Sequence, residues 1–227
     1  MSYRLSNNDK KILFVGAAAL GTQLITKLIE DMHIPPEKIA GFVDDVAQVG
    51  TQIKFDKQVL CSTEELIKNR KFHDHVVVCS IGYGNLIKRN NLFRKIAASK
   101  IEFLTILSEN VNLSNSVKIG KGCVVLPGCT IDTGVEIKDF CYLDVNVTIG
   151  EYSIIQNGCY LSNKATICGN CVIGESTFLG AASIVTNDFK LGRNNFVNAG
   201  CVVSQSTNDD THIAEGRRLR LLPHVSK

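Results

Sequence analysis

The sequence has no tryptophan and no apolar run long enough to cross a membrane. Its first residues also lack the apolar stretch and the small-residue cleavage site of a signal peptide. The lack of an apolar run and of a signal peptide predicts a cytoplasmic protein that does not span a membrane.

The chain also has little excess of one sign of charge, since its 227 residues carry a formal net charge of +3. So small a charge, evenly spread, argues against nucleic acid or an anionic membrane as the main partner. With 44% hydrophobic and 21% charged residues, the composition is that of a globular protein, which excludes a mostly disordered chain. The length suits one large domain or two small ones.

Cysteine is abundant, with nine in the chain. An odd number of cysteines without a secretion signal argues against a disulfide framework. The remaining uses are metal ligation, catalysis or burial, and only the positions of the cysteines can decide among these.

The first half of the chain alternates short apolar runs with helical patterns. The runs at 11–15, 39–43 and 76–78 predict strands, and helical spacing follows each of them. The last of these helices is basic and amphipathic, and it extends to about residue 100. Strands separated by helices predict a small parallel sheet covered on both faces.

Small or acidic residues follow each predicted strand, at the edge where such sheets bind ligands. They are the turn from Gly16 to Gly21, Asp44 with Asp45, and Gly82. A phosphate or nucleotide could bind there. The turn lacks the G-x-G-x-x-G pattern, which argues against a nicotinamide cofactor, and its small residues could serve close packing alone.

The second half repeats with a period of six residues. Seventeen consecutive positions at this spacing are Leu, Ile or Val: Leu107, Leu113, Ile119, Val125, Ile131, Ile137, Leu143, Ile149, Ile155, Leu161, Ile167, Ile173, Leu179, Val185, Leu191, Val197 and Val203. A hexapeptide parallel β-helix has this period, with the aliphatic residues inside. The repeat divides the chain into an α/β domain (1–106), a β-helix (107–206) and a C-terminal tail (207–227).

Most cysteines fall at a second inward position, four residues after an aliphatic one. They are Cys123, Cys129, Cys141, Cys159, Cys171 and Cys201. A free cysteine at such a position behaves as a small hydrophobic residue, so we predict burial. Cys168 and Cys171 have C-x-x-C spacing without a second pair for zinc, and we expect no metal site.

Two predicted strands, one followed by Gly16 and the other by Asp44 and Asp45, precede the hexapeptides. This combination resembles bacterial nucleotide-sugar acetyltransferases of the bacillosamine and perosamine type, grouped with the sialic acid O-acetyltransferases. The resemblance covers nearly the whole chain. It implies a Rossmann-like domain followed by a left-handed β-helix, a homotrimer, and acetyl-CoA bound along the coils between subunits. It also implies that the first domain holds a nucleotide-linked amino sugar through Ala18, Ala19, Leu20, Asp44, Asp45 and Gly82.

The catalytic histidine of the family is absent from its expected place, where this chain has Glu151. All five histidines are predicted to lie outside the hexapeptides, and Asp144 stands where the family has an asparagine. Glu151 could accept a proton from the sugar amine or hold the ammonium group, or it could be an exposed coil residue without a role. The resemblance gives the acetyl-CoA contacts as Tyr160, Gly169, Ala181, Asn187 and Ala199.

The function implied is N-acetylation of a UDP-, dTDP- or GDP-linked 4-amino-4,6-dideoxy sugar in the biosynthesis of surface polysaccharides such as the lipopolysaccharide O-antigen. The alternatives are a sugar O-acyltransferase of the sialic acid type and a non-catalytic homologue that binds sugar nucleotides. The segment 215–220 is expected either to contact the 3′-phosphate of the coenzyme through its arginines or to be a solvated basic tail.

Overall fold

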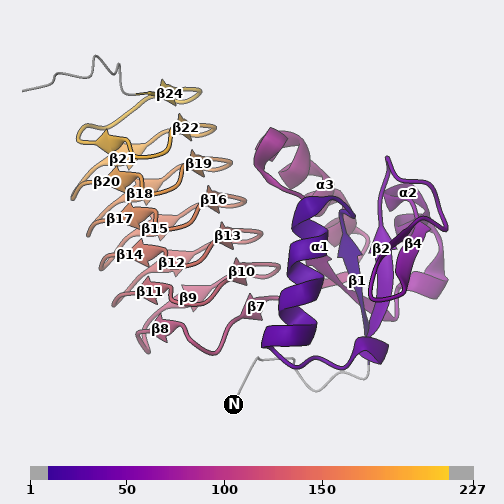
Figure 1. Cartoon of the computed structure of the whole chain (residues 1–227). Helices are drawn as coiled ribbons and strands as arrows, with labels where there is room; N and C mark the ends of the chain where they lie inside the picture. The colour runs from indigo at the N-terminus through magenta and orange to yellow at the C-terminus, as the bar shows by residue number, and fades with distance from the viewer. Residues whose placement is uncertain (1–9, 215–227) are drawn as a thin grey trace, which may run out of the picture.

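The computed structural model describes residues 10–214. An α/β domain and a stack of coils lie side by side (Figure 1). The arginines of the predicted coenzyme-binding segment, Arg217, Arg218 and Arg220, lie outside the described residues.

The α/β domain is built on a sheet with the strand order β3-β4-β2-β1-β5-β6. Its strands are β1 (Lys11–Val15), β2 (Ile39–Val43), β3 (Gln52–Lys54), β4 (Lys57–Cys61), β5 (His75–Cys79) and β6 (Glu102–Phe103). Its helices are α1 (Ala19–Thr26), extended by a π-helical turn (Lys27–Asp31), α2 (Thr63–Lys68) and α3 (Leu86–Ala98), with 3-10 turns at Pro36–Lys38, Arg70–Phe72 and Tyr83–Asn85. The three predicted strands are confirmed, and they pair in parallel.

The edge strand β3 departs from the predicted parallel sheet, because it runs antiparallel to β4. Phe55 and Asp56 join the two strands, with φ angles of 52° and 55°. Two consecutive residues with positive φ are typical of the type I′ turn of a tight hairpin. This hairpin was not predicted from the sequence, because neither turn residue is the glycine or asparagine that normally marks such a turn.

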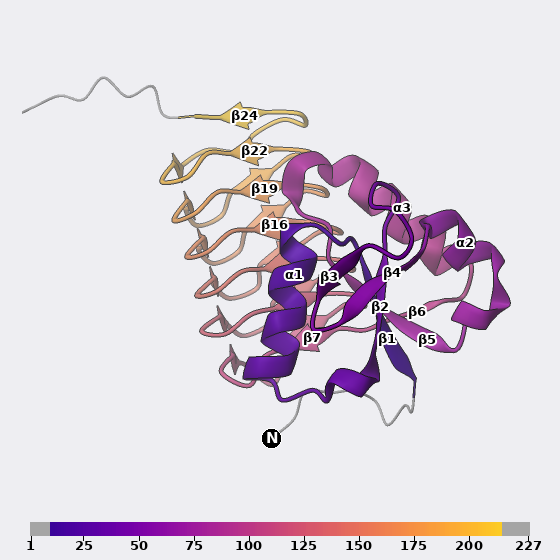
Figure 2. The same cartoon turned by 45° about the vertical axis from the view of Figure 1, so that its right-hand side comes forward.

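Both faces of the sheet are covered, as predicted. On one face Phe14 packs with Leu24 of α1, and this helix lies between the sheet and the coils (Figure 1). On the other face Leu13 packs with Leu66 of α2 and Phe93 of α3. The second view shows the same arrangement, with α3 beside the upper coils (Figure 2).

The coils form three parallel sheets of two-residue strands, which we name faces A, B and C. Face A contains β7 (Ile106–Leu107), β10 (Val124–Val125), β13 (Tyr142–Leu143), β16 (Tyr160–Leu161), β19 (Phe178–Leu179), β22 (Phe196–Val197) and β24 (His212–Ile213). Face B contains β8 (Asn112–Leu113), β11 (Thr130–Ile131), β14 (Thr148–Ile149), β17 (Thr166–Ile167), β20 (Ile184–Val185) and β23 (Val202–Val203). Face C contains β9 (Lys118–Ile119), β12 (Glu136–Ile137), β15 (Ile154–Ile155), β18 (Val172–Ile173) and β21 (Lys190–Leu191).

The interior of the β-helix follows the predicted register. The second residue of each strand from β7 to β23 is the predicted aliphatic one, and all of these residues belong to one core cluster. The six cysteines predicted to point inward are buried in that cluster, at 0% or 1% exposure. The predicted β-helix is therefore confirmed, and the role of these thiols is packing.

The coils continue past residue 206 through β24. Ile213 pairs with Val197, 16 residues earlier, whereas Val197 pairs with Leu179, 18 residues earlier. The prediction that all histidines lie outside the repeat is therefore wrong for His212. The last coil is two residues shorter than the others, so a strict count by six does not reach it.

A buried arginine on α3 joins the two domains. Arg89 is 2% exposed, and its Nε donates a hydrogen bond to the Ile81 carbonyl at 3.0 Å. Its Nη1 donates to the carbonyl of Gly158 at 3.2 Å and its Nη2 to that of Phe140 at 3.1 Å. One side chain thus connects the loop after β5 to two coils.

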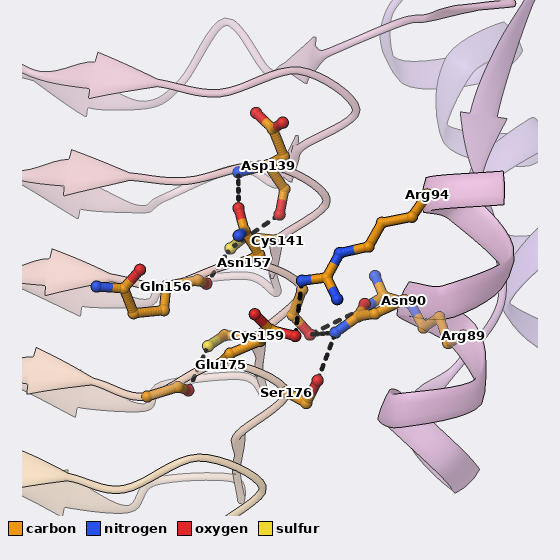
Figure 3. A network of polar contacts seen from close by, with 12 residues as sticks. Arg89, Asn90, Arg94, Asp139, Cys141, Gln156, Asn157, Cys159, Glu175 and Ser176 are labelled. Atoms are coloured by element: carbon orange, nitrogen blue, oxygen red, sulfur yellow. Dashed lines mark hydrogen bonds and ion pairs between the residues drawn. The ribbon is translucent and has the colours of Figure 1, made fainter. Parts of the chain in front are cut away.

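Two more residues of α3, Asn90 and Arg94, add polar contacts that extend to the next coil (Figure 3). Asn90 donates through Nδ2 to the Gly158 carbonyl at 3.3 Å and to Ser176 Oγ at 2.7 Å. Arg94 forms an ion pair with Glu175 at 2.6 Å. These contacts fix α3, and with it the loop that precedes α3, against the β-helix.

Candidate functional site

The carboxyl ends of β1, β2 and β5 form a rim at one edge of the sheet. Gly16 directly follows β1 and has a φ of +111°, and its N–H donates to the Val43 carbonyl of β2 at 2.9 Å. A side chain on Gly21 would collide with the Gly16 carbonyl oxygen. The packing role expected for small residues in this turn is therefore confirmed for both glycines, because Gly21 lets α1 lie close to the end of β1 and Gly16 lets the loop after β5 approach it.

The first turn of α1 is open. Ala18 and Ala19 are exposed and Leu20 is buried, and none of the described side chains caps the helix N-terminus. The first N–H groups of a helix have no partner within it and carry partial positive charge. This end of α1 can therefore accept an anionic group such as a phosphate.

Asp44 connects the loops that follow β1 and β2. Its Oδ2 accepts the N–H of Ala17 at 2.8 Å, and its Oδ1 accepts the N–H groups of Val46 at 2.8 Å and Ala47 at 2.9 Å. Burial raises the pKa of Asp44, but these three donors outweigh it and hold the pKa below its usual value. The carboxylate is ionised and already engaged by the backbone.

Asp45 is engaged in the same way at the start of α2. Its Oδ1 accepts the N–H of Thr63 at 2.7 Å and its Oδ2 accepts the hydroxyl of Thr63 at 2.6 Å. The structure thus places both predicted acids at the rim, where each has a structural role.

The third loop of the rim contains a serine that sequence reasoning missed. Ser80 is 1% exposed, and its Oγ lies 2.8 Å from the carbonyl oxygens of both Val15 and Gly16. Gly82 follows, and a side chain placed there would meet no atom within 4 Å. The signal for Ser80 was its place as the first polar residue after an apolar strand.

Tyr160 lies on face A and packs against the α/β domain. It is 6% exposed and stacks on Tyr142 with ring centroids 4.5 Å apart. Burial and the nearby Asp144 carboxylate raise the pKa of Tyr160 to about 12. Its hydroxyl therefore stays neutral at physiological pH.

The remaining predicted site residues divide between two corners of the β-helix. Those between faces B and C are Glu151, Gly169 and Asn187. Those between faces A and B are Asp144, Ala181 and Ala199. The B–C corner of a triangular coil is opposite face A, so a single chain does not bring Glu151 together with Asp144 or Tyr160.

Glu151 is half-buried at the B–C corner. Its carboxylate lies over Gly169 of the next coil, where an added methyl group would collide with it. Its main-chain oxygen accepts the N–H of Asn170 at 2.8 Å, but no side-chain hydrogen bond or ion pair engages the carboxylate among residues 10–214. This carboxylate can accept a proton or bind a cation.

Two further features bear on cofactors and location. Within residues 10–214, no group of three or more His, Cys, Asp or Glu side chains is arranged to hold a metal ion. No helix in the same part of the chain combines the length and the apolar composition needed to cross a membrane.

The described geometry recurs in solved structures. The acetyltransferase domain of PglB from Neisseria gonorrhoeae FA1090 has a TM-score of 0.77 and 19% identity, covering 90% of this chain and 96% of that one. PerB from Caulobacter crescentus, in complex with CoA and GDP-perosamine, has a TM-score of 0.78 and 19% identity, covering 90% and 93%. WeeI from Acinetobacter baumannii AYE has a TM-score of 0.60 and 21% identity, covering 89% and 95%.

The chain has the fold of these sugar acetyltransferases. The predicted architecture of an α/β domain followed by a β-helix is thereby confirmed. A family model described as the GMPPB C-terminal domain also matches residues 125–224. No curated protein sequence matches the chain.

Proposed function

We propose that the protein is an acetyl-CoA-dependent N-acetyltransferase that acts on a nucleotide-linked amino sugar. The observation that carries the proposal is the open rim of the sheet held directly beside a β-helix, an architecture shared with PglB and PerB. PerB binds CoA and GDP-perosamine, which supports both substrate classes. The protein would then act in the cytoplasm, in the biosynthesis of surface polysaccharides.

The rim supplies the acceptor site. The N–H groups at residues 18–20 suit the diphosphate, because the helix N-terminus there is uncapped and positive. Asp44 and Asp45 hold the neighbouring loop in place beside the ribose and base. Gly82 leaves room for the rest of the substrate to pass towards the coils.

A homotrimer completes the donor site. Apart from Tyr160, which lies on face A, the predicted acetyl-CoA residues of one chain lie at two separate corners. A groove between two copies would bring the B–C corner of one against the A–B corner of the next. Acetyl-CoA supplies an acetyl group activated as a thioester. The absence of side chains at Gly150 and Gly169 lets the coils stack closely at the B–C corner and lets the Glu151 carboxylate lie over Gly169.

Glu151 serves as the base. As the neutral amine of the sugar forms its bond to the acetyl carbonyl carbon, Glu151 accepts the proton that the nitrogen loses. The carbon–sulfur bond then breaks and its electron pair leaves with the coenzyme sulfur, which takes up a proton. Asp144 adds negative charge at the other corner, and the neutral hydroxyl of Tyr160 is able to donate a hydrogen bond.

Thiol release from acetyl-CoA tests the proposal. We expect turnover with at least one member of a panel of UDP-, dTDP- and GDP-linked 4-amino-4,6-dideoxy sugars, and none when the amine is replaced by a hydroxyl. The amide product should resist hydroxylamine. Binding of a sugar without turnover by any member of the panel would contradict the proposal.

A second candidate is a homologue that binds sugar nucleotides without acetylating an amine, or that acylates a hydroxyl. The predicted placement of Glu151 at the position of the family histidine favours it, as does the match of the coils to the GMPPB C-terminal domain. An ester product cleaved by hydroxylamine identifies O-acylation, and an activity unchanged in Glu151→Ala excludes Glu151 as the base.

A further inference from the structure

Aromatic side chains form a column on the outside of face A. Tyr142, Tyr160, Phe178 and Phe196 follow one another in successive coils, with neighbouring ring centroids 4.5, 5.9 and 4.6 Å apart. The α/β domain buries Tyr142 and Tyr160, whereas Phe196 is 39% exposed. The column therefore passes from the core between the domains to the surface.

Tyr83 meets the column from the side of the α/β domain. It lies in the 3-10 turn before α3 and stacks on Phe178, with ring centroids 4.4 Å apart and ring planes 28° apart. Tyr83 is nevertheless 48% exposed. A hollow of about 220 Å³ opens beside it, and its lining includes Tyr83, Phe178, Phe196, Asn85, Ser176 and Asn195.

This hollow continues the rim towards the coils. Tyr83 directly follows Gly82, and the side chain of Ile81 lies against Gly16 at the start of the α1 turn. Because β2, β1 and β5 are neighbours in the sheet, their ends span two strand spacings, or about 10 Å. A substrate lying along the rim from β2 to β5 would reach Tyr83 next.

We propose that Tyr83, Phe178 and Phe196 form the subsite for the hexose ring of the nucleotide-linked sugar. The inference rests on the proposed function, in which the sugar carries the reacting amine and the acyl donor lies along the coils. The sugar end of the substrate must then point towards the coils, and the rim meets them at this hollow. The faces of aromatic rings carry partial negative charge, which favours packing against the C–H groups of a sugar, including the methyl group of a 6-deoxy sugar.

The charge beside the hollow fits the sugar end rather than the phosphate end. A second hollow of about 200 Å³ shares Ile87, Ser176 and Asn194 with the first. Its charged lining residues are Glu175, Asp209, Asp210 and Arg193. Arg193 forms an ion pair with Asp209 at 2.8 Å, and Arg94 forms one with Glu175 at 2.6 Å. These side chains offer a diphosphate no excess of positive charge, whereas the carboxylates accept hydrogen bonds from hydroxyl and ammonium groups. The diphosphate is thus left to the positive end of α1, at the other side of Gly82.

Calorimetric binding to matched ligands tests the subsite. The probes are UDP, dTDP and GDP, each with and without a linked 4-amino-4,6-dideoxyhexose. In Tyr83→Ala we expect the affinity for the nucleotide sugar to fall about tenfold, while the affinity for the matching diphosphate changes by less than about twofold. Phe196→Ala, at a more exposed position, should change the affinities in the same direction, and Tyr83→Phe should retain the wild-type values.

Val202→Ala is the matched control, because Val202 is an apolar residue of face B with 50% exposure. It should change neither affinity. An equal loss of affinity for the diphosphate and for the nucleotide sugar would show that the nucleobase, and not the hexose, packs on the rings. Unchanged affinities would show that neither ligand contacts them. Either result overturns the subsite. A wild-type protein that binds none of the probes contradicts the proposed function itself, and tight sugar binding without turnover contradicts acetyl transfer but not the subsite.

Discussion

Asp44 at the rim of the sheet and Glu151 at a corner of the β-helix are both half-buried carboxylates, yet their surroundings differ. Three backbone N–H groups surround Asp44, and they hold its pKa below the usual value despite burial. The Glu151 carboxylate, in contrast, has no hydrogen-bond or ion-pair partner within the described residues. Asp44 stabilises a loop, whereas Glu151 is free to take part in chemistry.

This difference separates two roles that a sequence motif cannot distinguish. An acid after a strand can bind a ligand or hold its own loop, and Asp44 and Asp45 both do the second. Their contribution to substrate binding would then be indirect, through the shape of the rim. Substitutions at the rim should therefore affect folding, and substitution of Glu151 should affect turnover.

The largest effect is expected for Glu151→Gln, which cannot accept a proton. Turnover of the amino sugar should fall about 100-fold or more, the usual contribution of a general base, while the free energy of unfolding stays unchanged. Thiol release and urea unfolding measure the two quantities. Glu109→Gln, at an exposed glutamate of the first coil, is the control, and equal turnover in the two variants would remove Glu151 from the mechanism.

Asp44→Ala should show the opposite pattern. Removing the acceptor of three backbone N–H groups, including that of buried Ala17, should lower the free energy of unfolding by about 2 kcal/mol. Glu151→Ala should change it by less than about 0.5 kcal/mol. Urea denaturation compares both variants with the wild type. Similar losses in the free energy of unfolding would contradict the view that Asp44 stabilises the fold and Glu151 does not.

Asp45 should contribute less, because its two bonds involve only one residue, Thr63, whereas Asp44 accepts from three. We expect Asp45→Ala to cost about 1 kcal/mol, in the range of a lost helix cap. A double-mutant cycle with Thr63→Val isolates the bond between the carboxylate and the hydroxyl. If the two substitutions are additive, that side-chain pair contributes nothing.

The smallest effect concerns pH. Because the folded-state pKa of Asp44 is lowered, its ionised form stabilises the fold above the unfolded value of about 3.9, and this contribution is lost as the pH falls through the folded value. The difference in free energy of unfolding between the wild type and Asp44→Asn should therefore shrink between pH 6 and pH 3. Unfolding curves at both limits test this expectation, and a constant difference would contradict it.

The six-residue register predicted the interior of the β-helix because one inward aliphatic side chain per strand is enough to fix each coil. The six-residue register also places Asp144 and Glu151 at different corners, because one strand of face B lies between them in the chain. The six-residue register could not predict β24, because the last coil is two residues shorter and Ile213 therefore falls outside the sixfold spacing. His212 escaped notice for that reason.

Arg89 shows a different limit. The pattern of α3 indicates a basic amphipathic helix, in which an arginine is expected to face solvent. Its acceptors on the coils, however, are the main-chain carbonyls of Phe140 and Gly158, 51 and 69 residues further along the chain. Every residue has such a carbonyl, so no side-chain pattern could mark these partners.

That choice of partners has a consequence for how the two domains diverge. Because Arg89 binds carbonyl oxygens, the residue at 140 can be replaced without losing its bond to the guanidinium, while Gly158 is confined by the Asn90 amide packed against its α-carbon. The side chain at position 140 can therefore change while Arg89 still holds α3 against the same two carbonyl groups of the coils.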